Sequence, residues 1–328
     1  MVSIFLILVI FITPSHTHQE IIAASAYEGI NNEFSQSGIS ILHGNISNVI
    51  NHVTAQILAN SLENRINDAA AVLEITSKLP QIMSTPNSSL LNANIETLHG
   101  IPYDADMQKR KVALDILSNY DEFAEVAFVM PNGDRYFLEP YSFQINRTTN
   151  NFAYRDYFRG AITTNDTYLG DIITSAASGL KRAVIAVPVY SQTHTSNDQG
   201  QIVGVWVGAT DIDVLKNELQ SLNLTQNQRI VYVDSNGTKM ADSDRRLPLN
   251  GSESFYNLTS LQNAINGESG SIAEEVGGEM MQISYAPVQA VQKMWAVLLL
   301  QSLGSINNNN NNSTCTVTDA DNNLDDVA

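Results

Sequence analysis

Cysteine is almost absent from this sequence, which contains only Cys315, in a polar stretch near the C-terminus. One cysteine forms no disulfide within the chain and offers no framework for a cysteine metal site or for thiol catalysis. Basic residues are also scarce: 17 Lys and Arg stand against 34 Asp and Glu, which gives a formal net charge of -17. Because a surface this acidic repels phosphate backbones, we expect no nucleic-acid partner.

Enzymatic motifs are missing as well. The sequence contains no Gly-x-Ser-x-Gly elbow, no phosphate-binding glycine-rich loop with Lys, and no His-Glu-x-x-His pair. None of its six histidines falls at ligand spacing in a predicted core strand. We therefore expect no catalytic activity, no cofactor and no metal ion.

The N-terminal residues predict export. Residues Val2 to Ile12 are almost wholly apolar, but they are too few for a membrane span of about 20 residues. Residues 1–26 therefore read as a signal peptide or the remnant of a membrane anchor, with a buried N-terminal strand as the alternative. Sequons for N-glycosylation recur along both halves of the chain, at Asn45, Asn87, Asn146, Asn165, Asn223, Asn236, Asn250 and Asn257. We expect an extracytoplasmic glycoprotein, secreted or associated with the cell membrane through its N-terminus.

A long amphipathic helix is predicted over residues 36–78. From His43 to Lys78 apolar residues recur at spacings of three and four, and no Pro or Gly interrupts them before Pro80 apart from Gly44. A helix of this length exceeds the usual globular range, so it should pack along two modules or against a partner chain. The alternative is two helices that break near Asn60 or Asn67.

The rest of the chain reads as an internal repeat of about 100 residues. Asn132-Gly133 corresponds to Asn236-Gly237, Val187-Pro188-Val189 to Ala286-Pro287-Val288, and Trp206 to Trp295. Around these landmarks the pattern predicts two hairpin-helix-hairpin units. The predicted elements are strands at 125–130, 135–138, 181–190, 201–209, 229–233, 280–287 and 293–300, with helices at 105–119, 154–162 and 258–265.

These units predict an α+β fold, in which the long helix carries two tandem modules, each an antiparallel sheet flanked by helices. We place the first module at residues 79–212 and the second at 213–300. The Asn-rich acidic tail, residues 301–328, contains nothing that could bury a core, so we expect it to be disordered.

One polar-aromatic cluster stands out, from Phe152 to Ala161. If it is helical, Arg155 lies beside aromatic rings, and its planar guanidinium group is suited to bind a carboxylate with two hydrogen bonds in a pocket with apolar walls. The alternative is an arginine paired with a local aspartate, Asp156 or Asp171, with the rings as part of the core.

The segment Tyr154-Arg155-Asp156-Tyr157-Phe158-Arg159-Gly160-Ala161 resembles the Arg-x-aromatic-aromatic helix of double Cache domains, the extracellular sensors of chemoreceptors and sensor histidine kinases. Gly170 to Gly179 and Val184 to Val189 resemble the loop and strand that follow there, and Gly204 to Ile212 resembles the closing strand. The likeness extends roughly from Gln36 to Leu300. It implies two PAS-like Cache modules, of which the first, membrane-distal one binds the ligand.

The resemblance also implies site residues. Arg155 would anchor a ligand carboxylate and Asp211 would take its ammonium group. Tyr157 and Phe158 would form the pocket wall, and Tyr154 and Ile173 complete the predicted ligand-binding residues. Tyr157 stands where amino-acid-binding members carry Trp, while Phe158 and Ile173 stand where they carry Tyr. The ligand class therefore stays open between an amino acid, another amine and an organic acid.

The sequence as a whole favours the small-molecule sensing module of a signal transduction or chemotaxis receptor. The resemblance suggests two kinds of partner. One is a second copy of the chain, which would form a homodimer through the long helix, and the other is a separate signalling protein. We expect no output domain after the second module, and three interpretations stay open: a truncated receptor, a free-standing exported binder and a degraded copy. A solute-binding protein and a surface protein are the rival interpretations.

Overall fold

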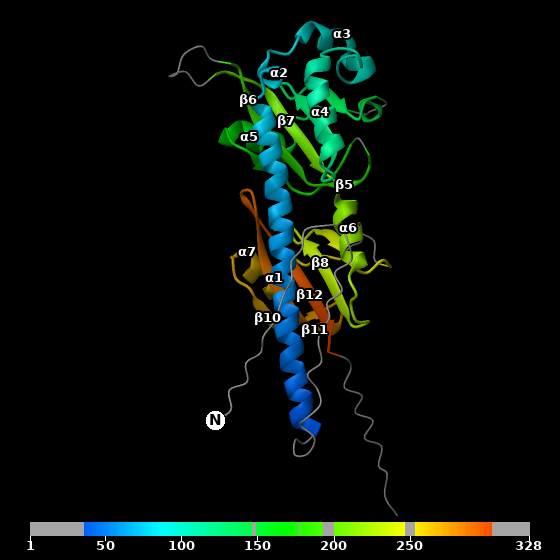
Figure 1. Ribbon diagram of the computed structural model, residues 1–328, viewed down its shortest axis with the longest axis vertical. Helices are drawn as coiled ribbons and strands as arrows, with labels where there is room; N and C mark the ends of the chain where they lie inside the picture. The colour runs from blue at the N-terminus through cyan, green and yellow to red at the C-terminus, as the bar shows by residue number, and fades with distance from the viewer. Residues whose placement is uncertain (1–35, 146–148, 177, 193–199, 247–252, 304–328) are drawn as a thin grey trace, which may run out of the picture. The chain divides into compact units, whose positions relative to one another are not determined.

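The computed structural model describes residues 36–145, 149–176, 178–192, 200–246 and 253–303 (Figure 1). The predicted export segment and most of the predicted C-terminal tail lie outside these residues. Helix α1 runs without a break from Gln36 to Ser77, so the alternative of two helices is wrong. Its buried side consists of small and aliphatic residues at helical spacing, namely Ala55, Leu58, Ala59, Leu62, Ile66, Ala69, Ala70 and Leu73.

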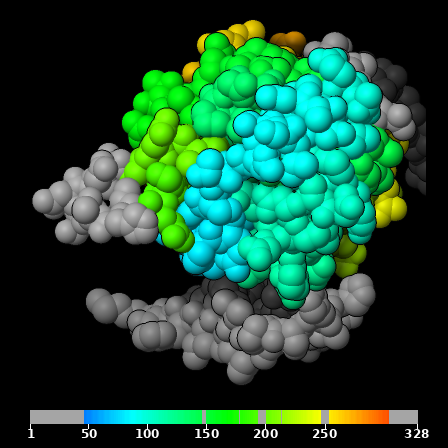
Figure 2. All heavy atoms as spheres, turned by 90° about the horizontal axis from the view of Figure 1, so that it is seen from above, coloured from blue at the N-terminus to red at the C-terminus, as the bar shows by residue number. Residues whose placement is uncertain are grey.

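The first sheet is antiparallel and follows three helices, α2 (Pro80–Met83), α3 (Ser88–Leu98) and α4 (Met107–Asn119). Its strand order is β2-β1-β7-β6-β3. The strands are β1 (Phe123–Val129), β2 (Arg135–Glu139), β3 (Tyr168–Leu169), β6 (Val184–Tyr190) and β7 (Ile202–Thr210). Between β2 and β3 come a 3-10 turn, Tyr141–Phe143, and helix α5, Asp156–Thr164. In Figure 2, residues of α3 and α4, coloured cyan to teal, form much of the surface of this module in that view.

The second sheet repeats this topology. Helix α6 (Ile212–Ser221) leads into β8 (Gln228–Val233) and β9 (Lys239–Asp242), and α7 (Thr259–Ile265) precedes the last three strands. These are β10 (Gly270–Val276), β11 (Glu279–Ala290) and β12 (Lys293–Ser302). The order β9-β8-β12-β11-β10 matches that of the first sheet strand for strand. The predicted α+β fold with two tandem sheet modules is therefore confirmed.

The repeat landmarks take equivalent places, with one exception. Gly133 and Gly237 both have φ in the left-handed region, +90° and +76°, at the turns β1–β2 and β8–β9. Trp206 pairs with Val187, and Trp295 pairs with Val288. Pro188 lies one position after Val187, whereas Pro287 lies one position before Val288, so the two prolines are out of register by two residues.

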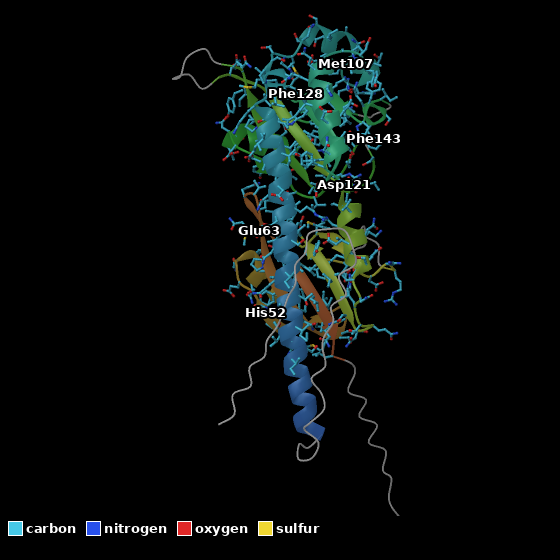
Figure 3. All side chains as sticks on the ribbon, viewed as in Figure 1. His52, Glu63, Met107, Asp121, Phe128 and Phe143 are labelled. Carbon is cyan, nitrogen blue, oxygen red and sulfur yellow. The ribbon has the colours of Figure 1, made fainter. Side chains whose placement is uncertain are left out.

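Helix α1, from Gly44 onward, contacts both sheets. The indole N–H of Trp206 in β7 donates to Thr76 Oγ1 at 3.0 Å. Glu63 of α1 accepts a hydrogen bond from the backbone N–H of Gln289 in β11 at 3.0 Å (Figure 3). Within the part of the chain described by the structure, no helix is both long and apolar enough to cross a membrane.

The predicted strand 181–190 is interrupted at Ala183. Its first two residues form β5 (Lys181–Arg182), which pairs with β4 (Ile173–Thr174) as a separate two-stranded sheet. Only Val184–Tyr190 joins the first sheet. This interruption matters because the β4–β5 hairpin then covers part of the sheet face on which the candidate site lies.

Candidate functional site

A cavity lies on the face of the first sheet that α5 and the β4–β5 hairpin cover. It is a small cavity of about 60 Å³ that opens to solvent. Strand alternation places Glu125, Ala127 and Val129 of β1 on this face, while Val126 and Phe128 enter the core on the side of α1. The lining residues are Glu125, Ala127, Val129, Arg135, Leu138, Phe152, Arg155, Tyr157, Ile173, Ser175, Ala176, Arg182, Val184, Val207 and Ala209. We call this space the arginine cavity.

Two of its three arginines are bound tightly by the protein. Arg135 is buried, donates from Nε to His99 O at 3.0 Å and from Nη2 to Gln144 O at 3.2 Å, and lies over the ring of Phe152. Arg182 is buried and donates from Nη1 to Asp211 Oδ1 at 3.0 Å. These contacts orient both guanidinium groups toward fixed partners.

Glu125 is the one carboxylate among the described residues that line the cavity. It is buried and accepts a hydrogen bond from Ser175 Oγ at 2.9 Å, and its Oε1 lies 4.0 Å from Arg182 Nε. One buried carboxylate beside three guanidinium groups leaves the cavity with an excess of positive charge.

Arg155 differs from the other two arginines. It is the N-cap residue of α5, half-buried, with its guanidinium carbon 5.0 Å from the centre of the Tyr154 ring. Among the described residues it has no ion pair, and its buried Nε has no hydrogen-bond partner. The alternative of a local pair is wrong, because Asp156 and Asp171 both interact with Lys293 instead. An arginine that lines a cavity without an anionic partner is suited to bind one.

The structure brings three of the six predicted site residues to this cavity: Arg155, Tyr157 and Ile173. Burial raises the pKa of the Tyr157 hydroxyl, so this group stays protonated at neutral pH and can donate a hydrogen bond. Phe158 is buried in the hydrophobic cluster beneath α5, and Tyr154 is 57% exposed.

Asp211 does not line the arginine cavity. Its carboxylate accepts from Arg182 and lies in a separate small hollow with Arg65, Glu122 and Val214. The resemblance implied that Arg155 and Asp211 take the two ends of one ligand. In the structure these two side chains do not face each other across one space. Sequence reasoning missed Glu125 and Arg182, although a carboxylate within the apolar run Phe123–Val129 was a visible signal.

The comparisons with known proteins bear on this geometry. The model of the Cache domain family dCache_1 matches residues 42–308. The chain belongs to the Cache domain family. This confirms the double Cache prediction, and with it the prediction of a ligand-sensing type of domain.

Solved Cache structures share the fold at low sequence identity. The extracellular domain of the putative histidine kinase rpHK1S-Z16 is 15% identical, with a TM-score of 0.58 over 80% of this chain and 96% of that one. The periplasmic sensory domain of the Campylobacter jejuni chemoreceptor Tlp1 is 13% identical, with a TM-score of 0.57 over 79% and 96%. The ligand-binding domain of the Pseudomonas aeruginosa PAO1 amino acid chemoreceptor PctB, in complex with L-Arg, is 14% identical, with a TM-score of 0.55 over 78% and 88%. No curated protein matches the sequence.

The second Cache sheet carries charges at the positions that line the cavity in the first. Val129 pairs with Arg135 and Ala127 with Leu138, while Val233 pairs with Lys239 and Val231 with Asp242. By this register Glu125, Arg135 and Leu138 are equivalent to Arg229, Lys239 and Asp242.

These second-sheet charges bind one another in a closed network with Glu253. Arg229 donates to both oxygens of Asp242, at 3.1 and 2.7 Å, and to both oxygens of Glu253, at 2.7 and 2.6 Å. Lys239 Nζ lies 2.8 Å from Asp242 and 3.1 Å from Glu253. Two cations thus match two anions, so the second sheet provides its own anions at these positions.

Proposed function

We propose that this Cache protein is the extracytoplasmic sensing module of a signal transduction or chemotaxis receptor, and that it binds a small carboxylate without chemical change. The observation that supports this most strongly is the Arg155 guanidinium, which lines an apolar-walled cavity without an anionic partner among the described residues. An amino acid, another amine with a carboxylate, or an organic acid would each fit this chemistry. The PctB domain of similar fold was solved with L-Arg, an amino acid of this class.

The two ends of such a ligand would meet different groups. Arg155 would grip the carboxylate, with Tyr157 and Ile173 as wall and Tyr154 stacked on the guanidinium. An ammonium group would lie nearest Glu125, the carboxylate in the cavity wall, while Asp211 would act through Arg182. Phe158 would support the wall from below.

The test is calorimetry and thermal shift with a panel of L-arginine, L-glutamine, L-isoleucine, L-serine and succinate. We expect at least one compound to stabilise the protein, and Arg155→Ala to weaken its binding roughly 10–100-fold, because a hydrogen-bonded charge pair is lost. Arg159→Ala is the matched control, since Arg159 is exposed one turn later on the same helix. Unchanged affinity in Arg155→Ala would overturn the site, and a panel without any binder would overturn the carboxylate class.

The two modules would have different roles. The closed ion network at the equivalent position of the second sheet supports a binding module at residues 79–212 and a transmitting module at 213–300. We infer that the first lies distal and the second proximal to the membrane, both carried by α1. A ligand complex with the compound at Arg229 rather than Arg155 would contradict this assignment.

The cellular setting is also a proposal. Cache domains of similar fold are extracellular or periplasmic parts of receptors, and the apolar segment before Thr13 supports export. We propose association with the cell membrane through the N-terminus, and a homodimer through exposed apolar residues of α1. A free-standing exported binder or surface protein is the second candidate, and recovery of the chain from spent medium rather than from membranes would favour it.

A further inference from the structure

The turn between β11 and β12 of the second sheet, with the first residue of β12, contacts a short segment of the first module, residues 168–171. Leu169 N–H donates to Gln292 Oε1 at 3.0 Å, and Gln292 Nε2 donates to Leu169 O at 2.8 Å. The next residue, Lys293, which begins β12, forms an ion pair with Asp171 and lies 3.6 Å from Asp156. Its ammonium also lies 5.7 Å from the centre of the Tyr168 ring. Residues about 122 positions earlier in the chain are thus held at several points by two neighbouring side chains.

The segment held in this way lies directly behind the wall of the arginine cavity. Asp171 N–H donates to Asp156 Oδ2 at 2.6 Å. Gly170 packs so closely that a Cβ there would stand 2.8 Å from Tyr157 Cβ. Asp156 itself stands between Arg155 and Tyr157 in the sequence, and both of these line the cavity. Any movement of Arg155 or Tyr157 on binding therefore meets the segment that the second sheet holds.

Electrostatics gives Lys293 a particular role in this contact. It is largely buried, with 14% of its side chain exposed, and it lies between two carboxylates, those of Asp156 and Asp171. Without its charge these two carboxylates, already connected through the Asp171 N–H, would repel each other in a partly desolvated place. The charge of Lys293 is therefore what allows Asp171 to stay against the first turn of α5.

We propose that Lys293 is a positioning residue of the ligand site, contributed by the opposite module, and that the β11–β12 turn couples the state of the arginine cavity to the second sheet. This rests on the proposed function of that cavity. The coupling must be reciprocal: if occupancy of the cavity shifts the turn, then loss of the turn's grip changes affinity in the cavity. A contiguous set of contacts makes such coupling physically possible, and coupling measurements decide it.

The first experiment needs no ligand. Hydrogen exchange is followed in the 168–174 segment of the full chain, in the wild type, Lys293→Gln and Lys293→Arg. We expect exchange on the order of tenfold faster in Lys293→Gln, because a charged contact that holds the segment is lost, and recovery in Lys293→Arg. The matched control is Lys111→Gln, which removes an exposed ion pair with Asp115. Equal exchange in the wild type and Lys293→Gln would overturn the positioning role.

The second experiment uses the tightest binder of the panel named above. In the wild type we expect it to slow exchange both at residues 152–176 and in the β11–β12 turn. In Lys293→Gln the protection should remain at the cavity but disappear at the turn, with affinity changed several-fold. Asp171→Asn should behave alike, and the double variant no worse than either single one. Protection at both places in Lys293→Gln would sink the coupling, whereas a panel without a binder would sink the proposed function and leave the ligand-free result standing.

Discussion

Arg135 and Lys239 begin equivalent strands, each two residues after the turn glycine, yet they meet opposite surroundings. Arg135 donates to two backbone carbonyls and lines an open cavity. Lys239 is bound by two carboxylates, Asp242 and Glu253. The difference arises because the position of Leu138 in the first sheet is occupied by Asp242 in the second. The carboxylate of Asp242 provides an anionic partner within the protein.

Glu253 provides a pH test of this network. Hydrogen bonds from Arg229, followed by the charges of Arg229 and Lys239, lower the pKa of the Glu253 carboxyl below its usual value of 4.5, although partial burial opposes them. A lowered folded pKa means that the carboxylate contributes stability above the unfolded value, and that this contribution is lost as the pH falls through the folded value. We therefore expect Glu253→Gln to reduce stability at pH 7, and to reduce it less as the solution is acidified below about 4.5.

Urea denaturation of both proteins between pH 7 and pH 3 measures this difference. Glu275→Gln is the control, because Glu275 is exposed on β10 of the same module. A loss in Glu253→Gln that is constant over this range would show that the carboxylate charge contributes nothing.

At the scale of elements, the two tryptophans show how α1 is fastened to the sheets. Trp206 and Trp295 are both fully buried and occupy equivalent places in β7 and β12. The indole N–H of Trp206 donates to Thr76 of α1, whereas that of Trp295 has no partner among the described residues. The C-terminal end of α1 is therefore held to the first sheet by the hydrogen bond between Trp206 and Thr76. The second sheet has no such bond from Trp295 among the described residues.

This pair gives a matched substitution experiment. Trp206→Phe and Trp295→Phe remove similar apolar volume, but only the first loses a hydrogen bond, so we expect it to cost about 1 kcal/mol more free energy of unfolding. Chemical denaturation measures both variants. Adding Thr76→Val should change the Trp206→Phe protein little, and equal losses in the two tryptophan variants would contradict the argument.

At the scale of the whole molecule, α1 carries an apolar stripe that the described part of the chain leaves exposed. Ile46, Val49, Ile50, Val53 and Ile57 are 41–63% exposed and recur at spacings of three and four. The same face of the helix turns polar at Asn60, Asn64 and Asp68, which are also exposed. Among the described side chains, the apolar part extends over about three turns, from Ile46 to Ile57, which suits helix pairing between two copies.

The proposed homodimer is tested on this stripe. We expect the protein to sediment with a concentration-dependent mass, and Ile50→Glu to shift it to the monomer, because a charge is then buried at the helix contact. Asn64→Glu, on the polar continuation of the same face, should leave the association unchanged. A monomer at all concentrations in the wild type, or equal effects of both substitutions, would rule out pairing through this stripe.

Much of the fold could be predicted from local patterns. Helical spacing predicted α1 to within one residue of its end, and the Asn-Gly turns predicted the β1–β2 hairpin of the first sheet and strand β8 with its turn in the second. The strands β3 and β9, with two and four residues, were missed because such short runs carry no periodic signal, and the longer helices α3 and α6 were missed as well. The proline landmark was shifted because a proline in a long strand is not tied to one register.

The sequence by itself determined the family, the repeat and the candidate role of Arg155, since periodicity and motif depend only on neighbouring residues. Tertiary structure alone decided where Asp211 points, that Glu125 enters the cavity, and that Lys293 stands behind its wall. Those outcomes depend on which charged side chains meet across the sheets. The sequence names each charged residue but does not say which distant residue it contacts, because packing in the folded chain sets those distances.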